Sequence, residues 1–258
     1  MDTDPDVPIE SVKRSYAVVD AIRERERAGV TELANALDLP KSTVHNHLRT
    51  LDALGYLVRR DGRYRLSTRY LHLGRESRNG NDVFLYGREE VRCLAERSNR
   101  YCQLVVEESG RGTILLATGW HYEDLPPSAR HVYPTHEHLH TNAPGKAILA
   151  HLPDDRVADI VARHGLPERT DRTITDESAL DEARATVRER GYAVDRGEMI
   201  PGMAGVAAPI ATDGRVHGAV AAYGSGAEMG PAIEGDLPTL VREAADGVRA
   251  DLTFAALE

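Results

Sequence analysis

Cysteine, lysine and long apolar runs are scarce in this sequence of 258 residues. Its two cysteines, Cys93 and Cys102, are too few for a disulfide framework or a zinc module built on cysteine. The longest apolar stretches, such as residues 113–118 and 216–223, fall far short of the roughly 20 residues that cross a bilayer. The acidic residues 1–10 lack the pattern of a signal peptide. These absences exclude a disulfide-rich secreted protein and a membrane protein, and they predict a cytoplasmic location.

Charge is divided unevenly along the chain. The whole sequence carries 32 Lys and Arg against 41 Asp and Glu, a formal net charge of −9. Residues 11–75 carry 13 basic and 7 acidic side chains, a net charge of +6, whereas residues 1–10 contribute −4 and residues 76–258 contribute −11. A basic segment on an acidic chain is typical of a protein that binds a polyanion with one end. We therefore expect a nucleic-acid-binding unit after a flexible acidic tail over residues 1–10.

Helical periodicity divides the first part of the basic segment into three short helices. The predicted helices are residues 12–27, closed by Gly29, residues 32–38, capped by Thr31, and residues 43–54, capped by Ser42 or Thr43. Gly55 follows where a left-handed residue commonly ends a helix. The short turn between the second and third helices predicts a helix-turn-helix.

After Gly55 the apolar pattern changes to the alternation that is typical of strands. Residues 56–60 and 63–66 flank Asp61-Gly62, a dipeptide that favours a two-residue hairpin turn. Together, the three helices and the hairpin predict a winged helix-turn-helix domain over residues 11–67.

The third predicted helix has one apolar face and one face that suits DNA. Asn can pair with adenine, Arg with guanine or phosphate, and Thr with the thymine methyl group, while arginines beside a hairpin turn can reach the DNA backbone or minor groove. The candidate DNA-binding residues are Lys41, Ser42, Thr43, His45, Asn46, Arg49, Thr50, Arg60 and Arg63. A solvated helix face with an ordinary turn is the alternative. The motif spacing and the local charge together favour double-stranded DNA.

A linker and a second domain follow the hairpin. Residues 67–78 read as a helix, and Asn79-Gly80-Asn81-Asp82 breaks the pattern before Asp82 caps a helix that ends at Ser98. We therefore expect residues 68–82 to form a linker helix that ends either in a hinge between the two domains or in a plain connection between them. Beyond it we expect strands at residues 101–108, 113–118, 192–195, 205–211 and 217–224, and helices at residues 153–164, 176–191 and 237–257. This mixture predicts an α+β or α/β domain.

Segments along both parts of the chain resemble the IclR family of transcription regulators, in matching order. They are residues 15–20, 31–34, 39–45, 51–57 and 62–66 in the basic segment, and residues 140–150, 190–195, 198, 202 and 206–210 beyond it. The resemblance covers about residues 11–250. It implies a homodimer or tetramer that binds a palindromic operator, with a GAF-like effector domain over residues 83–258, built on a mixed sheet flanked by helices.

The same resemblance implies an effector site in the second domain. Its residues would be His140, Asn142, Ala143, Pro144, Gly145, Asp195, Glu198, Gly205, Ala222 and Gly224. The loop before Gly145 opens onto a helix, so either its free backbone amides hold a carboxylate or phosphate, or the loop is a mere helix-entry turn. The resemblance also implies that the effector is a sugar acid or another small carboxylate from catabolism. Relatives have serines at the positions of Ala222 and Gly224, so the resemblance does not identify the ligand of this chain.

Two other functions have separate signals. His136, His138 and His140 stand at alternate positions, so in a strand their imidazoles would share one face. With His121 and His131 nearby, they could bind a metal ion. Pro134 and Glu137 favour a loop instead. A metal-responsive regulator is therefore the alternative. An enzyme fused to a helix-turn-helix is disfavoured, because no nucleophile elbow, zinc-protease or phosphate-loop motif occurs. We expect no catalytic residue and no cofactor. The acidic, lysine-poor composition is typical of a halophilic archaeon.

Overall fold

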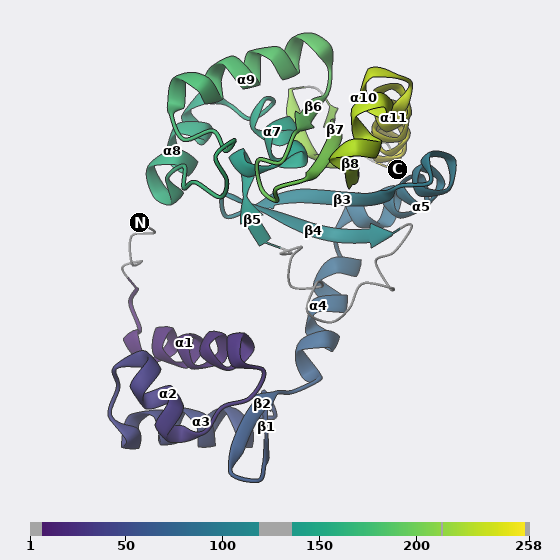
Figure 1. Cartoon of the computed structure of the whole chain (residues 1–258). Coiled ribbons are helices and arrows are strands. Elements are labelled where there is room, and N and C mark those ends of the chain that lie inside the picture. Colours follow the sequence, from purple (N-terminus) through teal and green to yellow (C-terminus); the bar gives the residue numbers. More distant parts are fainter. Residues whose placement is uncertain (1–6, 119–135, 213, 256–258) are drawn as a thin grey trace. The chain divides into compact units, whose positions relative to one another are not determined.

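The computed structural model describes residues 7–118, 136–212 and 214–255. The chain forms two units, an N-terminal unit that ends at Arg78 and a C-terminal unit that begins at Asn79 (Figure 1). This boundary falls inside the segment predicted as a linker, residues 68–82. None of the described helices combines the length and the apolar content that a membrane span requires.

The N-terminal unit consists of three helices, a hairpin and a fourth helix. These are α1 (Glu10–Arg25), α2 (Val30–Leu37), α3 (Lys41–Ala53), β1 (Leu57–Arg60), β2 (Arg63–Leu66) and α4 (Arg69–Asn79). A small core joins the first three helices and the hairpin, in which Ile22, Leu33, Leu48 and Tyr64 from α1, α2, α3 and β2 are buried together. The predicted winged helix-turn-helix is confirmed.

The turns of this unit agree with the prediction better than the helix starts do. Gly55 has φ of 78°, and Asp61 and Gly62 have φ of 49° and 76°, so the left-handed helix end and the hairpin turn are confirmed. Helix α1 ends at Arg25 rather than near Gly29, because Glu26 already takes a positive φ.

The predicted side-chain caps of the second and third helices are wrong. Gly29, not Thr31, precedes α2, and its amide donates to the Glu32 carboxylate at 2.8 Å. Helix α3 begins directly after Pro40, whose fixed φ suits a helix start, without a side-chain cap from Ser42 or Thr43.

The C-terminal unit combines one sheet with helices on both faces. Its described elements are α5 (Asp82–Ser98), β3 (Tyr101–Glu108), β4 (Arg111–Thr118), β5 (His136–His138), the 3₁₀ helix η1 (Leu139–Thr141), α7 (Ala143–Leu149), α8 (Asp154–His164), α9 (Glu177–Arg190), β6 (Ala193–Asp195), β7 (Met203–Thr212), β8 (Arg215–Ser225), α10 (Gly226–Glu234) and α11 (Leu237–Ala255). The sequence did not predict α10, because two glycines and Pro231 interrupt its helical pattern.

The sheet has the strand order β5-β4-β3-β8-β7-β6, and every neighbouring pair is antiparallel. The mixed sheet that the family resemblance implied is therefore wrong for the described strands. Two hairpins, β3–β4 and β7–β8, impose this direction on two of the five pairs, since a tight turn can join only antiparallel strands.

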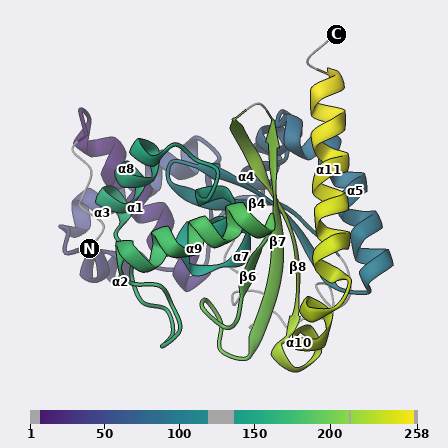
Figure 2. The same cartoon turned by 90° about the horizontal axis from the view of Figure 1, so that it is seen from above.

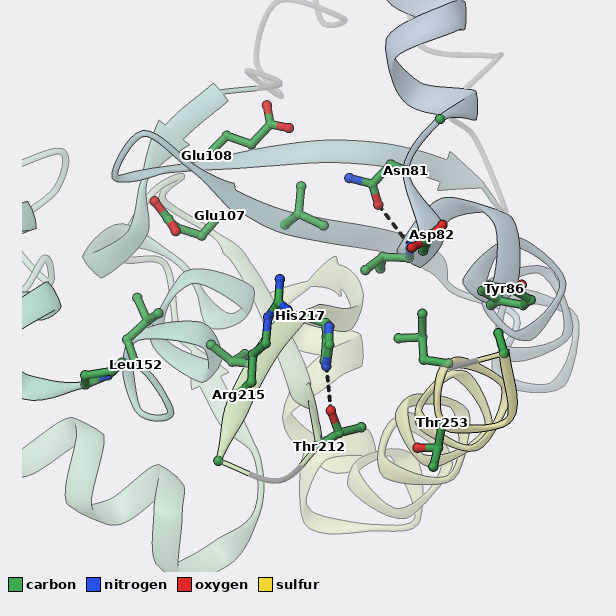
Figure 3. A pocket seen from close by; sticks show the side chains of 18 residues that line it. Asn81, Asp82, Tyr86, Glu107, Glu108, Leu152, Thr212, Arg215, His217 and Thr253 are labelled. Carbon is green, nitrogen blue, oxygen red and sulfur yellow. Dashed lines mark hydrogen bonds between the residues drawn. The ribbon is translucent and has the colours of Figure 1, made fainter. Parts of the chain in front are cut away.

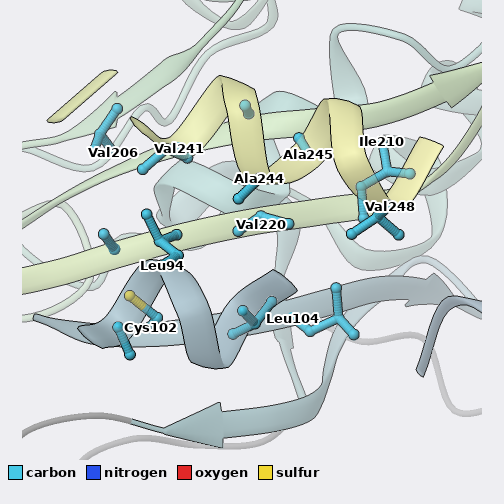
Figure 4. Packing of buried hydrophobic residues seen from close by; sticks show 14 of the residues in the cluster. Leu94, Cys102, Leu104, Val206, Ile210, Val220, Val241, Ala244, Ala245 and Val248 are labelled. Atoms are coloured by element: carbon cyan, nitrogen blue, oxygen red, sulfur yellow. The ribbon is translucent and has the colours of Figure 1, made fainter. Parts of the chain in front are cut away.

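Helices α5 and α11 cover one face of the sheet, and α7 with α9 cover the other (Figure 2). Alternate residues of each strand supply the two cores. Leu104, Val206 and Val220 pack with Val241 and Val248 of α11 (Figure 4). Their strand neighbours Val105, Ala207, Ala221 and Tyr223 face α7 instead. This alternation decides which side chains reach the candidate site.

Asn81, not the expected Asp82, caps α5. The Asn81 side chain accepts a hydrogen bond from the Val83 amide at 3.0 Å. We expect Asn81→Ala to lower the free energy of unfolding of the C-terminal unit by about 1 kcal/mol, because the first turn loses its acceptor. Asp82→Ala should cost less. Urea unfolding of the full chain, with hydrogen exchange of α5 peptides, would measure both; a larger loss in Asp82→Ala contradicts this assignment.

Candidate DNA-binding face and effector cavity

Helix α3 presents a polar face to solvent because its apolar residues anchor it. Val44 and Leu48 are fully buried. The candidate residues Lys41, Ser42, His45, Asn46, Arg49 and Thr50 are exposed, and Thr43 is half-buried. Thr50 donates its hydroxyl hydrogen to the Asn46 carbonyl oxygen at 2.9 Å. Within the described chain, the Asn46 amide and the Arg49 guanidinium have no protein partner, so both groups are available to a base edge or a phosphate.

The two wing arginines differ in their surroundings. The Arg63 guanidinium lies 2.8 Å from a Glu32 carboxylate oxygen and donates to the Arg27 carbonyl oxygen at 3.3 Å. The Gly29 amide and then Arg63 hold the pKa of Glu32 below its ordinary value. Arg63 therefore fixes the hairpin against α2. Arg60 is exposed and makes no ion pair with any residue that the structure describes.

Two small cavities of about 20 and 10 Å³ lie on the α7 side of the sheet and share Gln103, Met199 and Tyr223. We call them the paired cavity. The remaining lining residues are Val105, Gly112, Ile114, Glu137, Asn142 and Pro144 in the first, and Asp195, Ile200 and Met203 in the second. At this size each has room for about one water molecule.

Tyr223 crosses this site from β8. Its ring lies over Gly205 of the neighbouring strand, where a Cβ atom would be 2.3 Å from the ring, so only glycine fits there. Its hydroxyl oxygen accepts a hydrogen bond from the Ala143 amide at 3.1 Å. Burial, followed by the Asp195 charge, raises the pKa of Tyr223 well above its ordinary value. The phenol is thus a fixed, neutral part of the cavity wall.

Asp195 ends β6 inside the same region and is only 2% exposed. Its Oδ1 accepts hydrogen bonds from the amides of Gly197, at 2.9 Å, and Glu198, at 2.8 Å. Burial raises the pKa of Asp195 to about 6, against the opposing effect of these amides and of Lys146. The carboxyl group is consequently ionised at neutral pH at a cost in stability.

Lys146 of α7 forms a nearly buried ion pair with Glu198. The segment that carries Glu198 is held by Thr173, whose hydroxyl donates to the Glu198 carbonyl oxygen at 2.6 Å, and by Thr170, which donates to the Gly197 carbonyl oxygen at 2.8 Å. This ion pair connects α7 to the loop that follows Asp195 and that contributes Met199 and Ile200 to the paired cavity.

Comparison with known proteins agrees with this two-unit architecture. Residues 11–61 match the IclR helix-turn-helix domain, and residues 89–250 match the domain described as "Bacterial transcriptional regulator IclR C-terminal". The "Probable HTH-type transcriptional regulator ArcR" of Halobacterium salinarum is 33% identical over 96% of this chain and 95% of its own length. The chain belongs to the IclR family of transcriptional regulators. It therefore combines a DNA-binding unit with an effector-binding unit.

Two further IclR-family relatives cover nearly the whole chain. The "Glycerol operon regulatory protein" of Streptomyces griseus is 31% identical over 95% of this chain and 96% of its own. An IclR homologue from Microbacterium hydrocarbonoxydans, solved in complex with 4-hydroxybenzoate, shares the fold with a TM-score of 0.74 at 23% identity, over 94% of this chain and 99% of that one.

The sequence-based picture of free amides at the start of α7 is wrong. The Ala143 amide donates to Tyr223, the Gly145 amide donates to the Asn142 side chain at 2.9 Å, and Pro144 has no amide hydrogen. Gly145 is required for a steric reason, because a Cβ there would lie 2.0 Å from the Leu139 carbonyl oxygen. These backbone donors are already used within the protein.

Two predicted effector residues lie on the opposite face of the sheet. Ala222 packs into the core beneath α5 and α11, and a Cβ on Gly224 would meet Met229 of α10. Tyr223, between them, faces α7, because successive residues of a strand point to opposite faces of the sheet. Gly205 lies under the Tyr223 ring, while Glu198 is engaged by Lys146. Of the predicted set, Asn142, Pro144 and Asp195 line the paired cavity.

The histidine run does not form one strand face. Strand β5 ends at His138, and His140 lies in η1, where its Nε2 is 3.1 Å from the Pro167 carbonyl oxygen. His136 Nδ1 is 2.9 Å from the Thr113 hydroxyl. Within residues 7–118, 136–212 and 214–255, no three His, Cys, Asp or Glu side chains are grouped as a metal ion requires. His121 and His131 lie outside these described ranges.

Sequence reasoning missed the residues that contribute most to the paired cavity, namely Gln103, Tyr223 and the methionines. Gln103 gave a usable signal: it is a single amide inside an otherwise apolar run from Cys102 to Val106 and is 5% exposed. A buried polar residue in a central strand commonly indicates a site.

A much larger groove of about 1060 Å³ lies elsewhere on the C-terminal unit (Figure 3). The start of α5, the end of β3, the β7–β8 hairpin and the end of α11 surround it, and it contains the hydrogen bond of 2.6 Å between Thr212 and His217. It includes no predicted effector residue and is lined by side chains of both charges.

Proposed function

We propose that this IclR-family regulator binds a palindromic operator with the exposed face of α3 and with Arg60 of the wing. The observation that supports the proposal is that Asn46 and Arg49 lie side by side on α3, exposed and without protein partners in the described chain, while the buried residues Val44 and Leu48 fix the helix behind them. Lys41, Ser42 and His45 would contact the backbone around the same groove, since phosphate contacts set the register.

A homodimer is part of this proposal, because a palindromic operator requires two copies of α3. Exposed apolar side chains in the N-terminal unit support it. Val12 and Tyr16 of α1 are 48% and 63% exposed and lie one turn apart, and Leu71 and Leu73 of α4 are also exposed. Such residues are costly in water, and burial against a second copy removes that cost.

We further infer that a small metabolite binds in the paired cavity and changes the affinity for the operator, and that the targets are catabolic genes. The relative named for a glycerol operon and the homologue solved with 4-hydroxybenzoate support a small organic ligand. A cytoplasmic regulator without enzymatic activity fits both units. The halobacterial relative and the acidic composition support a halophilic source.

The test of the α3 assignment is Asn46→Ala and Arg49→Ala. Each should weaken specific binding by about 1–3 kcal/mol and relax the preference at one base position, because each removes one base-directed group. The measurement is titration of full-length protein on a duplex selected by the wild type from a random library, at fixed salt, followed by footprinting.

Arg242→Ala in α11 is the matched control, because it removes an exposed arginine from the C-terminal unit. It should leave the base preference unchanged. If Asn46→Ala and Arg49→Ala both keep the wild-type footprint and affinity, α3 is not the recognition helix.

A further inference from the structure

We propose that Arg69 is a positioning residue that holds the recognition helix α3 to the linker helix α4 and thereby sets the spacing between the two operator half-sites. The inference rests on the proposed function, in which two copies of the chain bind a palindromic operator. It adds the contact through which α3 is held in the dimer, a role that is separate from the base contacts of Asn46 and Arg49.

Helix α4 is attached to the rest of the N-terminal unit at its first turn. It buries none of its own residues, and residues 71–77 are all exposed. Its side-chain contacts with the end of α3 and with the base of the hairpin come from Arg69 and Tyr70. A helix without a buried face has no packing surface to fix its direction. The orientation of α4 relative to α3 therefore depends on these two side chains.

Arg69 contacts the C-terminal end of α3. Its Nη1 donates to the carbonyl oxygen of Leu54, the residue that caps α3, at 3.0 Å. The last carbonyl oxygens of a helix have no partner inside the helix, and a cation beside them also interacts favourably with the helix dipole. The same guanidinium group lies over the ring of Tyr56, directly before β1, at 4.7 Å from the ring centre. One side chain of α4 is thus bound to α3 and to the hairpin at once.

Tyr70 completes this contact. Its ring centre is 5.6 Å from that of Tyr56. Burial, and then the phenols of Tyr16 and Tyr56, raise the pKa of Tyr70 above its ordinary value, so Tyr70 also lies near α1. The Ser67 amide donates to the Tyr56 carbonyl oxygen at 3.1 Å, and the Ser67 hydroxyl accepts from the Arg69 amide at 3.1 Å. We call Tyr56, Arg69 and Tyr70 the linker clamp.

The linker clamp connects α3 to a surface of the proposed dimer. Leu71 and Leu73, which follow the clamp on α4, are 55% and 39% exposed and belong to the apolar surface proposed to meet the second copy. In that dimer α4 is held by its partner, so the distance and rotation between the two α3 helices depend on the angle at which each α3 meets its own α4. Because Arg69 fixes this angle, both helices fit half-sites of one spacing.

Operators with altered spacing test the inference on the full chain. The duplex that the wild type selects is compared with duplexes in which one central base pair is added or removed, a change that rotates one half-site by about 35° and shifts it by about 3.4 Å. The wild type should bind the selected spacing about tenfold or more tightly than either altered one. Arg69→Ala should reduce this ratio to about threefold, because α3 then turns more freely against α4. The base preference within each half-site should stay unchanged.

Two further variants make the test specific. Tyr56→Leu removes the ring beneath the guanidinium group and should lower the spacing ratio to a similar extent. Combining it with Arg69→Ala should add little, because both changes break the same contact. Arg75→Ala is the matched control, since it removes another exposed arginine from the same helix, and it should keep the wild-type ratio.

The possible failures are distinct. A wild-type spacing ratio in Arg69→Ala, or an equal loss in Arg75→Ala, would overturn the inference and leave the palindromic operator intact. A uniform loss of affinity at all three spacings would also overturn it, because that result identifies Arg69 as a phosphate contact. If the wild type itself shows no preference for one spacing, the proposed function on a palindromic operator fails, and this inference fails with it.

Discussion

Lys146→Met should lower the free energy of unfolding of the C-terminal unit by about 3–5 kcal/mol, which is the usual cost of breaking a buried ion pair from one side. Lys146 is 6% exposed, and its ammonium group pairs with Glu198. Methionine keeps the length and apolar stem of the side chain, so the packing of α7 is largely retained. What remains is a nearly buried Glu198 carboxylate close to Asp195, without a cation.

The double variant Lys146→Met with Glu198→Gln separates the ion pair from simple packing. Because it leaves no uncompensated charge on Glu198, it should recover much of the lost stability. Arg97→Met, which breaks the exposed pair between Arg97 and Glu243, should cause a much smaller loss, since both side chains are about half exposed. Urea unfolding, with hydrogen exchange of β7 and β8 peptides, measures all three. If Lys146→Met alone is as stable as the wild type, the ion pair between Lys146 and Glu198 does not stabilise the C-terminal unit.

The DNA-binding unit could be predicted almost completely from local signals. Gly55 and Asp61-Gly62 require positive φ, and these requirements fix a helix end and a hairpin turn without any knowledge of the rest of the chain. The helical spacing of the apolar residues along α3, such as Val44 and Leu48, then determines which face is exposed. The helix starts were less predictable. Glu32 and Pro40 fix the starts of α2 and α3, whereas the sequence suggested side-chain caps from Thr31 and Ser42.

The effector cavity was harder to predict because it depends on register between strands that are far apart in the sequence. Gly205 pairs with Tyr223 across β7 and β8, and this pairing places the tyrosine on the α7 face and Ala222 on the other. A shift by one residue exchanges the faces, and the sequence of β8 alone, rich in alanine and glycine, does not distinguish them. The partner of the Ala143 amide could not be assigned either, since its acceptor, Tyr223, lies 80 residues away.

Asp195 should make the C-terminal unit less stable as pH rises through the interval from about 4 to 6. Burial raises the pKa of this carboxyl to about 6 in the folded chain, whereas an unfolded aspartate titrates near 3.9. Between these values the folded state binds the extra proton, so raising the pH favours the unfolded state. The difference of roughly two pKa units corresponds to a loss of about 3 kcal/mol in the free energy of unfolding. This loss is absent below pH 4 and complete above pH 6.

Asp195→Asn isolates this effect. Asparagine retains an oxygen for the Gly197 and Glu198 amides but cannot ionise, so the variant should gain stability relative to the wild type as pH rises from 4 to 7. The measurement is the difference in unfolding free energy between the two proteins across that range, with Asp251→Asn on α11 as the control for losing one formal charge. A difference that does not change with pH would show that Asp195 is not held in a charged, buried state.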